Sequence, residues 1–405
     1  MRGMRAPSTL RVLLVCTFAA CVNGVNNTEG TNIGVDTDEI VGGSDTTIAE
    51  HPWQVALTLR GNQFCGGSIV SPDWILTSRT CTIDGTSALG VVAGITRKSQ
   101  REVGQIRTVD AITAPPGFID AIHGNDIALL HVSPSLDLSG PDAKSICWLK
   151  PLDNTIFRAT AAGAVATVTG WGALSSGGPT PDILQSVDIP IVSNAQVLTL
   201  YGLDLPSDEL AAGVIGIGGK DACARDTGGP LTVRVPKGSS TQQLAGVVSW
   251  GFGCALRDVP GFYARVSSFD AYMRDRVNGR VVTQLALTNQ SGSFASFTHH
   301  AVTVADKSLA LSILVRGGFG DADLYVQHGS QPTTAAFVCR SANGGNDELC
   351  TIDSPAAGTW FISLRGSSSS AYSGVSITAV TIVPPPLQCP SPPCRIPCNG
   401  PWPTF

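Results

Sequence analysis

Four segments of the chain carry side chains that could take part in chemistry. One of them places a hydroxyl group, that of Thr227, beside an aspartate and two glycines, and another holds the acid Asp126 in front of an apolar run. A threonine hydroxyl is a competent nucleophile only beside an amine or another base, so a partner for Thr227 is needed. None of the six histidines falls inside the four segments, which are Ile40-Val41-Gly42-Gly43, Cys65 to Cys81, Asn125 to Leu130 and Lys220 to Leu231.

In their order and spacing these segments resemble the trypsin/chymotrypsin serine proteases. Three shorter motifs extend the resemblance over roughly 230 residues, and an ordered set of this kind is far more specific than any single motif. They are Gly170-Trp171-Gly172, Ser249-Trp250-Gly251 and Pro260-Gly261-Phe262-Tyr263. The resemblance implies an all-β fold, a chymotrypsin-like double six-stranded β-barrel that ends in a C-terminal helix.

The chemistry of this family needs a serine nucleophile, a histidine base and an aspartate that orients the imidazole. Where the family has Thr-Ala-Ala-His-Cys, this chain has Thr77 to Cys81 with Thr80 at the histidine position. Where the family has Gly-Asp-Ser-Gly-Gly-Pro, Thr227 replaces the serine. Asp126 matches the retained triad acid. A threonine hydroxyl cannot serve as a general base near neutral pH, so the resemblance implies a disabled site.

Arg225 stands where the family has a glycine whose backbone N–H helps to stabilise the oxyanion, together with the N–H of residue 227. Its Cβ and long cationic side chain would tilt that peptide or cover the oxyanion hole. Loss of the nucleophile and the base as a unit costs about 10⁶ in kcat, or roughly 8 kcal/mol. His123, three residues before Asp126, is the leading candidate for a substitute base. We expect a protein that binds rather than cuts.

The binding features of the family are better preserved. Asp221 aligns with the acidic base of the trypsin specificity pocket, and Ser249, Gly251 and Gly261 align with its walls. The resemblance therefore implies a pocket for a lysine or arginine side chain of another protein, held by a charge-assisted contact. The alternative is that Asp221 is solvated or paired internally.

Activation also departs from the family pattern. In the family, cleavage before Ile-Val-Gly-Gly frees an ammonium group that pairs with the aspartate preceding the nucleophile, which is Asp226 here. The residue before Ile40 is Glu39, so a protease of trypsin-like specificity should not cut there. Either the chain is processed unusually or the Ile40–Asp226 pair does not form.

The elements that must position these residues are short strands. Between Ile40 and about Ser267, β-branched runs alternate with turn residues, which indicates a barrel or a sandwich. A helix is then predicted from Ser267, as its N-cap, to Val277, with Gly279 just beyond its end. The expected strands include Gln54 to Leu59, Gly67 to Ser78, Asp126 to Val132, Ala164 to Gly170 and Leu244 to Trp250.

A second set of strands follows residue 280, and a signature within it resembles the pre-peptidase C-terminal domain, a small β-sandwich. The signature consists of Gly320 to Val326, two cysteines and Ala356 to Trp360. Asp321 and Asp323 are either calcium ligands or capping residues of a turn, and the second reading is the commoner one. The expected strands are Ala301 to Val304, Leu309 to Val315, Ala322 to Gln327 and Thr359 to Arg365.

The domain organisation follows from these patterns. Three arginines and the apolar run Val12 to Cys21 predict a secretory signal peptide over 1–24, so we expect a secreted, extracellular protein. A lipoprotein signal with Cys21 as the lipidated residue is the rival interpretation. We expect a propeptide-like segment over 25–39, a trypsin-like (peptidase S1) domain over 40–280, a β-sandwich over 281–382 and a Pro/Cys-rich tail over 383–405.

Ten cysteines remain after the signal peptide, an even number that favours disulfides over metal ligands. The two resemblances imply the bridges Cys65–Cys81, Cys223–Cys254 and Cys339–Cys350. Cys147 and three tail cysteines are left, and they allow three pairings. Our hypothesis is that Cys147 bonds one of the tail cysteines, which are Cys389, Cys394 and Cys398.

Composition excludes several functions. The net charge of −5 and the absence of a basic stripe argue against nucleic acid and anionic membranes as partners. We expect a monomer without a metal or cofactor. Three functions remain open: a catalytically inactive homologue that acts as inhibitor, decoy or cofactor; a weak trypsin-like endopeptidase that uses Thr227; and a matrix- or carbohydrate-binding protein that acts through its C-terminal domain.

Overall fold

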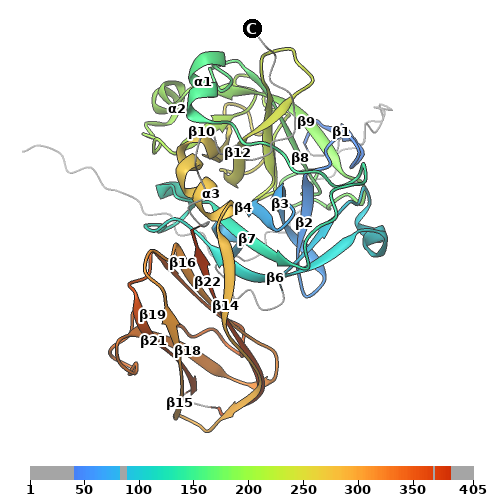
Figure 1. Ribbon diagram of the computed structural model, residues 1–405. Coiled ribbons are helices and arrows are strands. Elements are labelled where there is room, and N and C mark those ends of the chain that lie inside the picture. The colour runs from blue at the N-terminus through green and yellow to red at the C-terminus, as the bar shows by residue number, and fades with distance from the viewer. Residues whose placement is uncertain (1–40, 83–88, 368–369, 385–405) are drawn as a thin grey trace, which may run out of the picture. The chain divides into compact units, whose positions relative to one another are not determined.

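The computed structural model describes residues 41–82, 89–367 and 370–384 (Figure 1). The predicted signal peptide, the residues up to and including Ile40, and the Pro/Cys-rich tail from residue 385 lie outside the described residues. Within the described part, strands dominate and helices are few, as the sequence predicts.

Six antiparallel strands close the first barrel (Figure 1). Branched side chains from all of them fill its interior, and Val55, Ile69 and Leu130 are fully buried. In barrel order the strands are β2 (Gln54–Leu59), β3 (Asn62–Ser71), β4 (Trp74–Thr77), β7 (Ala128–Ser133), β6 (Gln105–Thr113) and β5 (Leu89–Ala93).

A second six-stranded barrel closes because β8 (Val165–Gly170) pairs with a strand on each side. Its core includes Val168, Ile189 and Leu231, all fully buried. The other strands, in order, are β9 (Gln185–Val192), β10 (Glu209–Ala212), β13 (Gly261–Arg265), β12 (Gln242–Trp250) and β11 (Pro230–Arg234), with the short β1 (Ser44–Asp45) added to β9.

Helices are short and lie between or after the strands. A proline at the start of α1 (Pro151–Phe157) supplies a helix-compatible φ, and a capping box by Ser193 and Gln196 begins α2 (Asn194–Tyr201). The 3₁₀ turns are η1 (Thr80–Thr82), η2 (Lys98–Val103), η3 (Ala121–His123) and η4 (Val266–Phe269).

The predicted C-terminal helix is confirmed as α3 (Asp270–Val277), but it does not begin where the sequence predicts. Ser267 does not cap it; Ser267 lies in the buried turn η4, and the residue before the helix is Phe269. The side chains of Val266 and Phe269 pack into the core and fix this extra turn. Tertiary packing therefore moves the N-cap position two residues beyond the sequence signal, from Ser267 to Phe269.

The region after residue 280 forms two antiparallel sheets, the predicted β-sandwich, so the all-β fold class is confirmed (Figure 1). Fully buried Ile313, Leu324 and Ile362 lie in its core. One sheet contains β14 (Arg280–Gly292), β22 (Tyr372–Val383), β16 (Ala310–Arg316), β20 (Glu348–Asp353) and β17 (Phe319–Gly320). The other contains β15 (Phe297–Val304), β21 (Gly358–Gly366), β18 (Ala322–His328) and β19 (Cys339–Ser341).

One predicted strand proves to be parts of two. The run from Gly67 to Ser78 is divided between β3 and β4 by a turn at Pro72 and Asp73. Proline has no N–H to donate to a ladder, and its fixed φ suits the first central position of a turn, so the chain reverses there.

Three predicted disulfides are confirmed: Cys65–Cys81, Cys223–Cys254 and Cys339–Cys350. Cys147 is disulfide-bonded as well. The tail cysteines lie outside the described residues, so the hypothesis that one of them is its partner stays a prediction.

The two barrels approach each other closely at glycines. The N–H of Gly66 in β3 donates to the carbonyl of Thr227 over 2.8 Å. A Cβ at Gly66 would lie 2.9 Å from the Cα of Gly229, and one at Gly228 would lie 2.2 Å from Thr77 Oγ1. The backbone around Thr227 is therefore held against the first barrel by residues that have no side chain.

We expect Gly228→Ala to lower the free energy of unfolding by at least about 2 kcal/mol more than Gly238→Ala does. Both glycines have a φ of 84°, so placing an alanine in this left-handed conformation destabilises both variants to the same extent. Nothing lies within 4 Å of a Cβ at Gly238, whereas the methyl group at position 228 overlaps Thr77 and Gly66. Urea unfolding of the two variants measures the difference, and equal losses would contradict the close-approach argument.

Candidate functional site

The pairing of β4 with β7 brings Thr80 to Asp126. Thr77, the last residue of β4, lies opposite Ala128 at the start of β7, so the residues just beyond these strand ends meet. Thr80 begins the turn η1, which the Cys65–Cys81 bridge ties to β3. The first barrel therefore positions both side chains.

The carboxylate of Asp126 is buried, with 1% of the residue exposed, and three donors satisfy it. Asp126 Oδ1 accepts from the backbone N–H of Thr80 at 2.7 Å and from Thr80 Oγ1 at 3.0 Å. Asp126 Oδ2 accepts from Ser249 Oγ in β12 at 2.5 Å. Burial raises the pKa of Asp126, and the bonds from Ser249 and Thr80 oppose that rise. The Thr80 hydroxyl is thus a donor to Asp126.

No base in the described part of the chain forms a hydrogen bond with the side chain of Thr227. Within the described residues its hydroxyl makes no hydrogen bond, although its carbonyl accepts from Gly66. The predicted substitute base, His123, forms a contact of 2.6 Å between its Nδ1 and Asp120 Oδ1, and 62% of its side chain is exposed. No hydrogen bond joins His123 to Thr227 or Thr80 in this part of the chain. The structure therefore does not bring His123 into a triad.

Arg225 keeps the left-handed backbone that a glycine would adopt, with a φ of 76°. Such a conformation costs a non-glycine residue about 1 kcal/mol. Gln63 Nε2 donates to the Arg225 carbonyl over 2.9 Å and holds this peptide. Across the described residues, neither the N–H of Arg225 nor that of Thr227 donates a hydrogen bond to the protein. The backbone of Arg225 thus keeps a glycine-like conformation, and the expected effect of this residue on the oxyanion hole stays a prediction.

A cavity of about 300 Å³ opens beside Thr227, with Asp221 in its lining. Ser249, Gly251 and Gly261 line it too, so the four residues that the sequence assigns to a pocket are brought together. A Cβ at Gly261 would lie 2.6 Å from Asp221 Oδ1, which explains why a glycine stands there.

Asp221 has an unused oxygen. Its Oδ2 accepts from the N–H of Ala255 at 3.0 Å, whereas its Oδ1 and the hydroxyl of Tyr263 are buried and unpartnered within the described residues. Nor does Asp221 form an ion pair with any described residue. Burial raises the pKa of Asp221 to about 7. A buried acceptor without a donor is costly, so this pocket favours a cationic donor from outside.

Asp226, the residue before Thr227, is buried and accepts hydrogen bonds from backbone donors. Its Oδ1 accepts from the N–H of Gly172 at 2.7 Å, and its Oδ2 accepts from the N–H of Cys223 at 3.0 Å. Burial raises its pKa to about 6. A Cβ at Gly170 would lie 2.1 Å from this carboxylate, so the Gly-Trp-Gly motif makes room for it. Ile40, its predicted partner, lies outside the described residues.

Sequence reasoning missed Glu209, a buried acid in β10 behind the pocket wall. Its Oε1 accepts from Trp250 Nε1 at 3.3 Å, and its Oε2 is unpartnered among the described residues. Burial raises the pKa of Glu209 to about 8, so it is largely neutral at pH 7. A strand-end acid normally indicates a solvated position, and no motif marks this one.

Asp321 and Asp323 are not joined by a third described side chain with which they could hold a metal ion. Asp321 Oδ1 accepts from the N–H of Gly345 at 3.0 Å, the behaviour of a capping residue. Among the described residues, no group of three histidine, cysteine or acidic side chains could hold a metal ion.

The described residues also contain no helix with the length and apolar character that crossing a membrane requires.

Two family models match the chain. The one described as Trypsin matches residues 40–273, and the one described as Bacterial pre-peptidase C-terminal domain matches residues 297–366. These matches agree with the two resemblances seen in the sequence.

Curated relatives agree as well. The chain is 35% identical to a trypsin of Saccharopolyspora erythraea over 245 residues, which are 60% of this chain and all of that protein. It is 38% identical to trypsin-1 of Astacus astacus, over 56% of this chain and 95% of that protein. It is also 38% identical to trypsin zeta of Drosophila melanogaster, over 64% of this chain and 95% of that protein. The chain has two closed barrels and a pocket lined by Asp221, and the Trypsin family model matches more than half of it. The chain therefore belongs to the trypsin family.

Proposed function

We propose that this trypsin-family protein is secreted and acts by binding another protein, as an inhibitor, decoy or cofactor, without cleaving it. The observation that carries the proposal is that no proton acceptor among the described residues forms a hydrogen bond with the hydroxyl of Thr227. The partner is held through a lysine or arginine side chain in the Asp221 pocket.

The arrangement around Thr227 supports inactivity. Acyl transfer needs a base within hydrogen-bond reach of the nucleophile, about 2.6–3.2 Å. The hydroxyl of Thr80 donates to Asp126, and His123 contacts Asp120 instead. Without the nucleophile–base unit, the loss is about 10⁶ in kcat, or roughly 8 kcal/mol of transition-state stabilisation.

The Asp221 pocket supports binding. A guanidinium or ammonium group that enters it would donate to the unpartnered Asp221 Oδ1 and to the Tyr263 hydroxyl. A hydrogen bond to a charged group contributes about 1.5–3 kcal/mol, and relief of two buried unpaired acceptors adds to it. Recognition of this kind needs no proton transfer, so it survives the loss of the triad.

Ester hydrolysis tests the inactive reading. We expect wild-type protein and Thr227→Ala to hydrolyse an arginyl ester at the same rate, that of the buffer, and a serine-directed phosphonate to label neither. Active trypsin under the same conditions is the positive control. Turnover by the wild type that disappears in Thr227→Ala would refute the proposal and favour a weak endopeptidase.

The pH dependence of amidine binding tests the pocket. Only the ionised carboxylate pairs with a cation, and the free pocket holds the pKa of Asp221 at about 7. The affinity for benzamidine, measured by calorimetry, should therefore rise about tenfold per pH unit from pH 5 to about 7 and then level off. We expect Asp221→Asn to abolish both the affinity and its pH dependence.

Asp275→Asn is the matched control for that experiment, because it removes an exposed carboxylate on α3. Its binding curve should coincide with that of the wild type. A pH-independent affinity in the wild type, or full affinity in Asp221→Asn, would show that Asp221 is a relic.

A further inference from the structure

A second cavity lies on the other side of the 224–227 loop from the Asp221 pocket. It has a volume of about 310 Å³, and its lining includes Arg225 and Gln63, whereas the Asp221 pocket is lined by Ala224 and Thr227. The two cavities therefore share one short loop as their common wall.

Three cations line this second cavity: Lys98, Arg101 and Arg225. Ala56, Val92 and Ile95 give it an apolar part, and no acid is among its lining residues, all of which belong to the described part of the chain. A partly enclosed apolar surface strengthens the field of the charges around it. The cavity is therefore suited to an anion.

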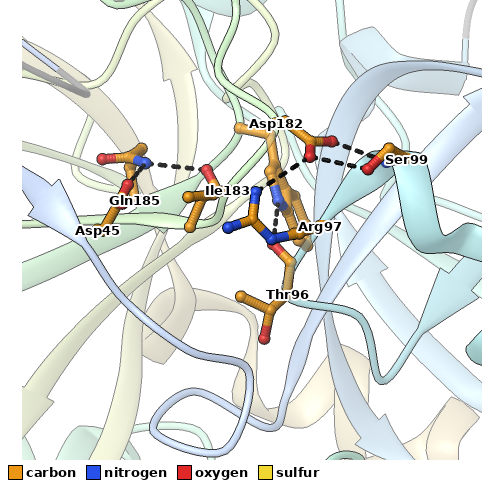
Figure 2. A network of polar contacts seen from close by, with 8 residues as sticks. Asp45, Thr96, Arg97, Ser99, Asp182, Ile183 and Gln185 are labelled. Carbon is orange, nitrogen blue, oxygen red and sulfur yellow. Dashed lines mark hydrogen bonds and ion pairs between the residues drawn. The ribbon is translucent and has the colours of Figure 1, made fainter.

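The nearby acids are already engaged, as Figure 2 shows for Asp182. Its carboxylate accepts from the N–H of Ser99 at 2.7 Å, from Ser99 Oγ at 2.8 Å and from Arg97 at 3.4 Å. Asp226 is buried and accepts two backbone N–H groups. Arg101 itself pairs with Glu102, whose Oε1 lies 3.8 Å from Arg101 Nε. Among the described residues, Lys98 and Arg225 are therefore the lining cations that no carboxylate holds in an ion pair.

Lys98 is held in place rather than free to swing away. The backbone N–H of Lys98 donates to the carbonyl of Asp182 at 3.0 Å. The neighbouring Arg97 forms an isolated antiparallel β-bridge with Ile183. Lys98 Nζ donates to Thr180 Oγ1 at 2.9 Å, which leaves two ammonium protons for a ligand. Burial first, and then the charge of Arg225, lower the pKa of Lys98. An anion between Lys98 and Arg225 would relieve that repulsion.

Arg225 is the second anchor. Its guanidinium makes no hydrogen bond or ion pair with any described residue, and its backbone stays in a left-handed conformation that a glycine would adopt at no cost. Gln63 fixes the carbonyl of the same residue. A strained backbone that presents an unpaired cation beside a cavity points to a ligand for that cation.

We propose that Lys98, Arg101 and Arg225 form a subsite for a carboxylate side chain of the bound polypeptide. The inference rests on the proposed function, because the same ligand places a basic side chain in the Asp221 pocket. The recognised segment is therefore bipolar, with an arginine or lysine on one side of the 224–227 loop and a glutamate or aspartate on the other.

Matched peptides test the subsite. Labelled octapeptides carry one arginine and two glutamates, which precede it in one series and follow it in the other; in the reference peptides glutamines replace the glutamates. We expect the wild type to bind the glutamate peptide of at least one series about tenfold more tightly than its reference, by fluorescence anisotropy. Raising the salt from 50 mM to 500 mM should reduce the preference.

Three variants give the test its specificity. Arg225→Gly and Lys98→Gln should each reduce the preference to threefold or less. Arg225→Gly also relieves the left-handed backbone, so loss of folding cannot account for its result. Lys237→Gln removes one exposed positive charge outside the cavity and should keep the tenfold preference.

The possible failures can be told apart. If benzamidine binds but the glutamate and glutamine peptides bind equally, the subsite is wrong and the proposed function stands. If neither benzamidine nor any peptide binds, both are wrong. If dextran sulfate binds the wild type but not Lys98→Gln while the peptides show no preference, the cavity serves a sulfated polyanion and the proposal is overturned.

Discussion

The buried carboxylate of Asp126 is the contact on which the arrangement of the site depends. It receives Thr80 from the first barrel and Ser249 from the second, so one charged group joins both halves of the domain. A buried charge is tolerated only when donors surround it, and breaking such a set typically costs several kcal/mol. Thr80 supplies two of the three donors, one from its backbone and one from its hydroxyl. The carboxylate therefore stays satisfied without an imidazole.

The proposed function separates two properties that are usually joined in this family. Cleavage requires a proton to travel from the nucleophile to a base and on to a leaving group. Recognition of a side chain requires a cavity, an acceptor at its base and a rigid wall. The chain has the features of the second set in Asp221, Gly261 and the 224–227 loop. Among the described residues, the hydroxyl of Thr80 bonds to Asp126, and no hydrogen bond joins it to Thr227.

Sequence reasoning predicted the features that short motifs encode. The cysteine pairs, Asp126 and the pocket residues lie in motifs that resemble those of known families, and those resemblances implied their roles. The alternating strands by themselves predicted a barrel or a sandwich. The start of α3 was predicted wrongly, because the burial of Val266 and Phe269 decides it rather than the capping preference of Ser267.

Other residues of the site could not be predicted, because only packing reveals them. Lys98 lies in a short turn without a motif, and its closeness to Arg225 depends on how loops of the two barrels meet. Glu209 is a charged residue at the start of a strand, where a side chain is usually solvated, yet it is buried beside Trp250. In both cases the charge of the residue argues for solvent, and long-range contacts override that argument.

The glycine contact between the barrels has a consequence for how this protein can vary. Gly66, Gly228 and Gly229 are fixed by the absence of space, whereas the hydroxyl of Thr227, which they frame, bonds to no described residue. If every single substitution were tested, most changes at the three glycines would destabilise the fold, whereas changes at Thr227 would be tolerated. Under the proposed function, the residue at position 227 can then change while the surrounding loop keeps its shape. The glycines thus fix the shape of the loop independently of the side chain that it frames.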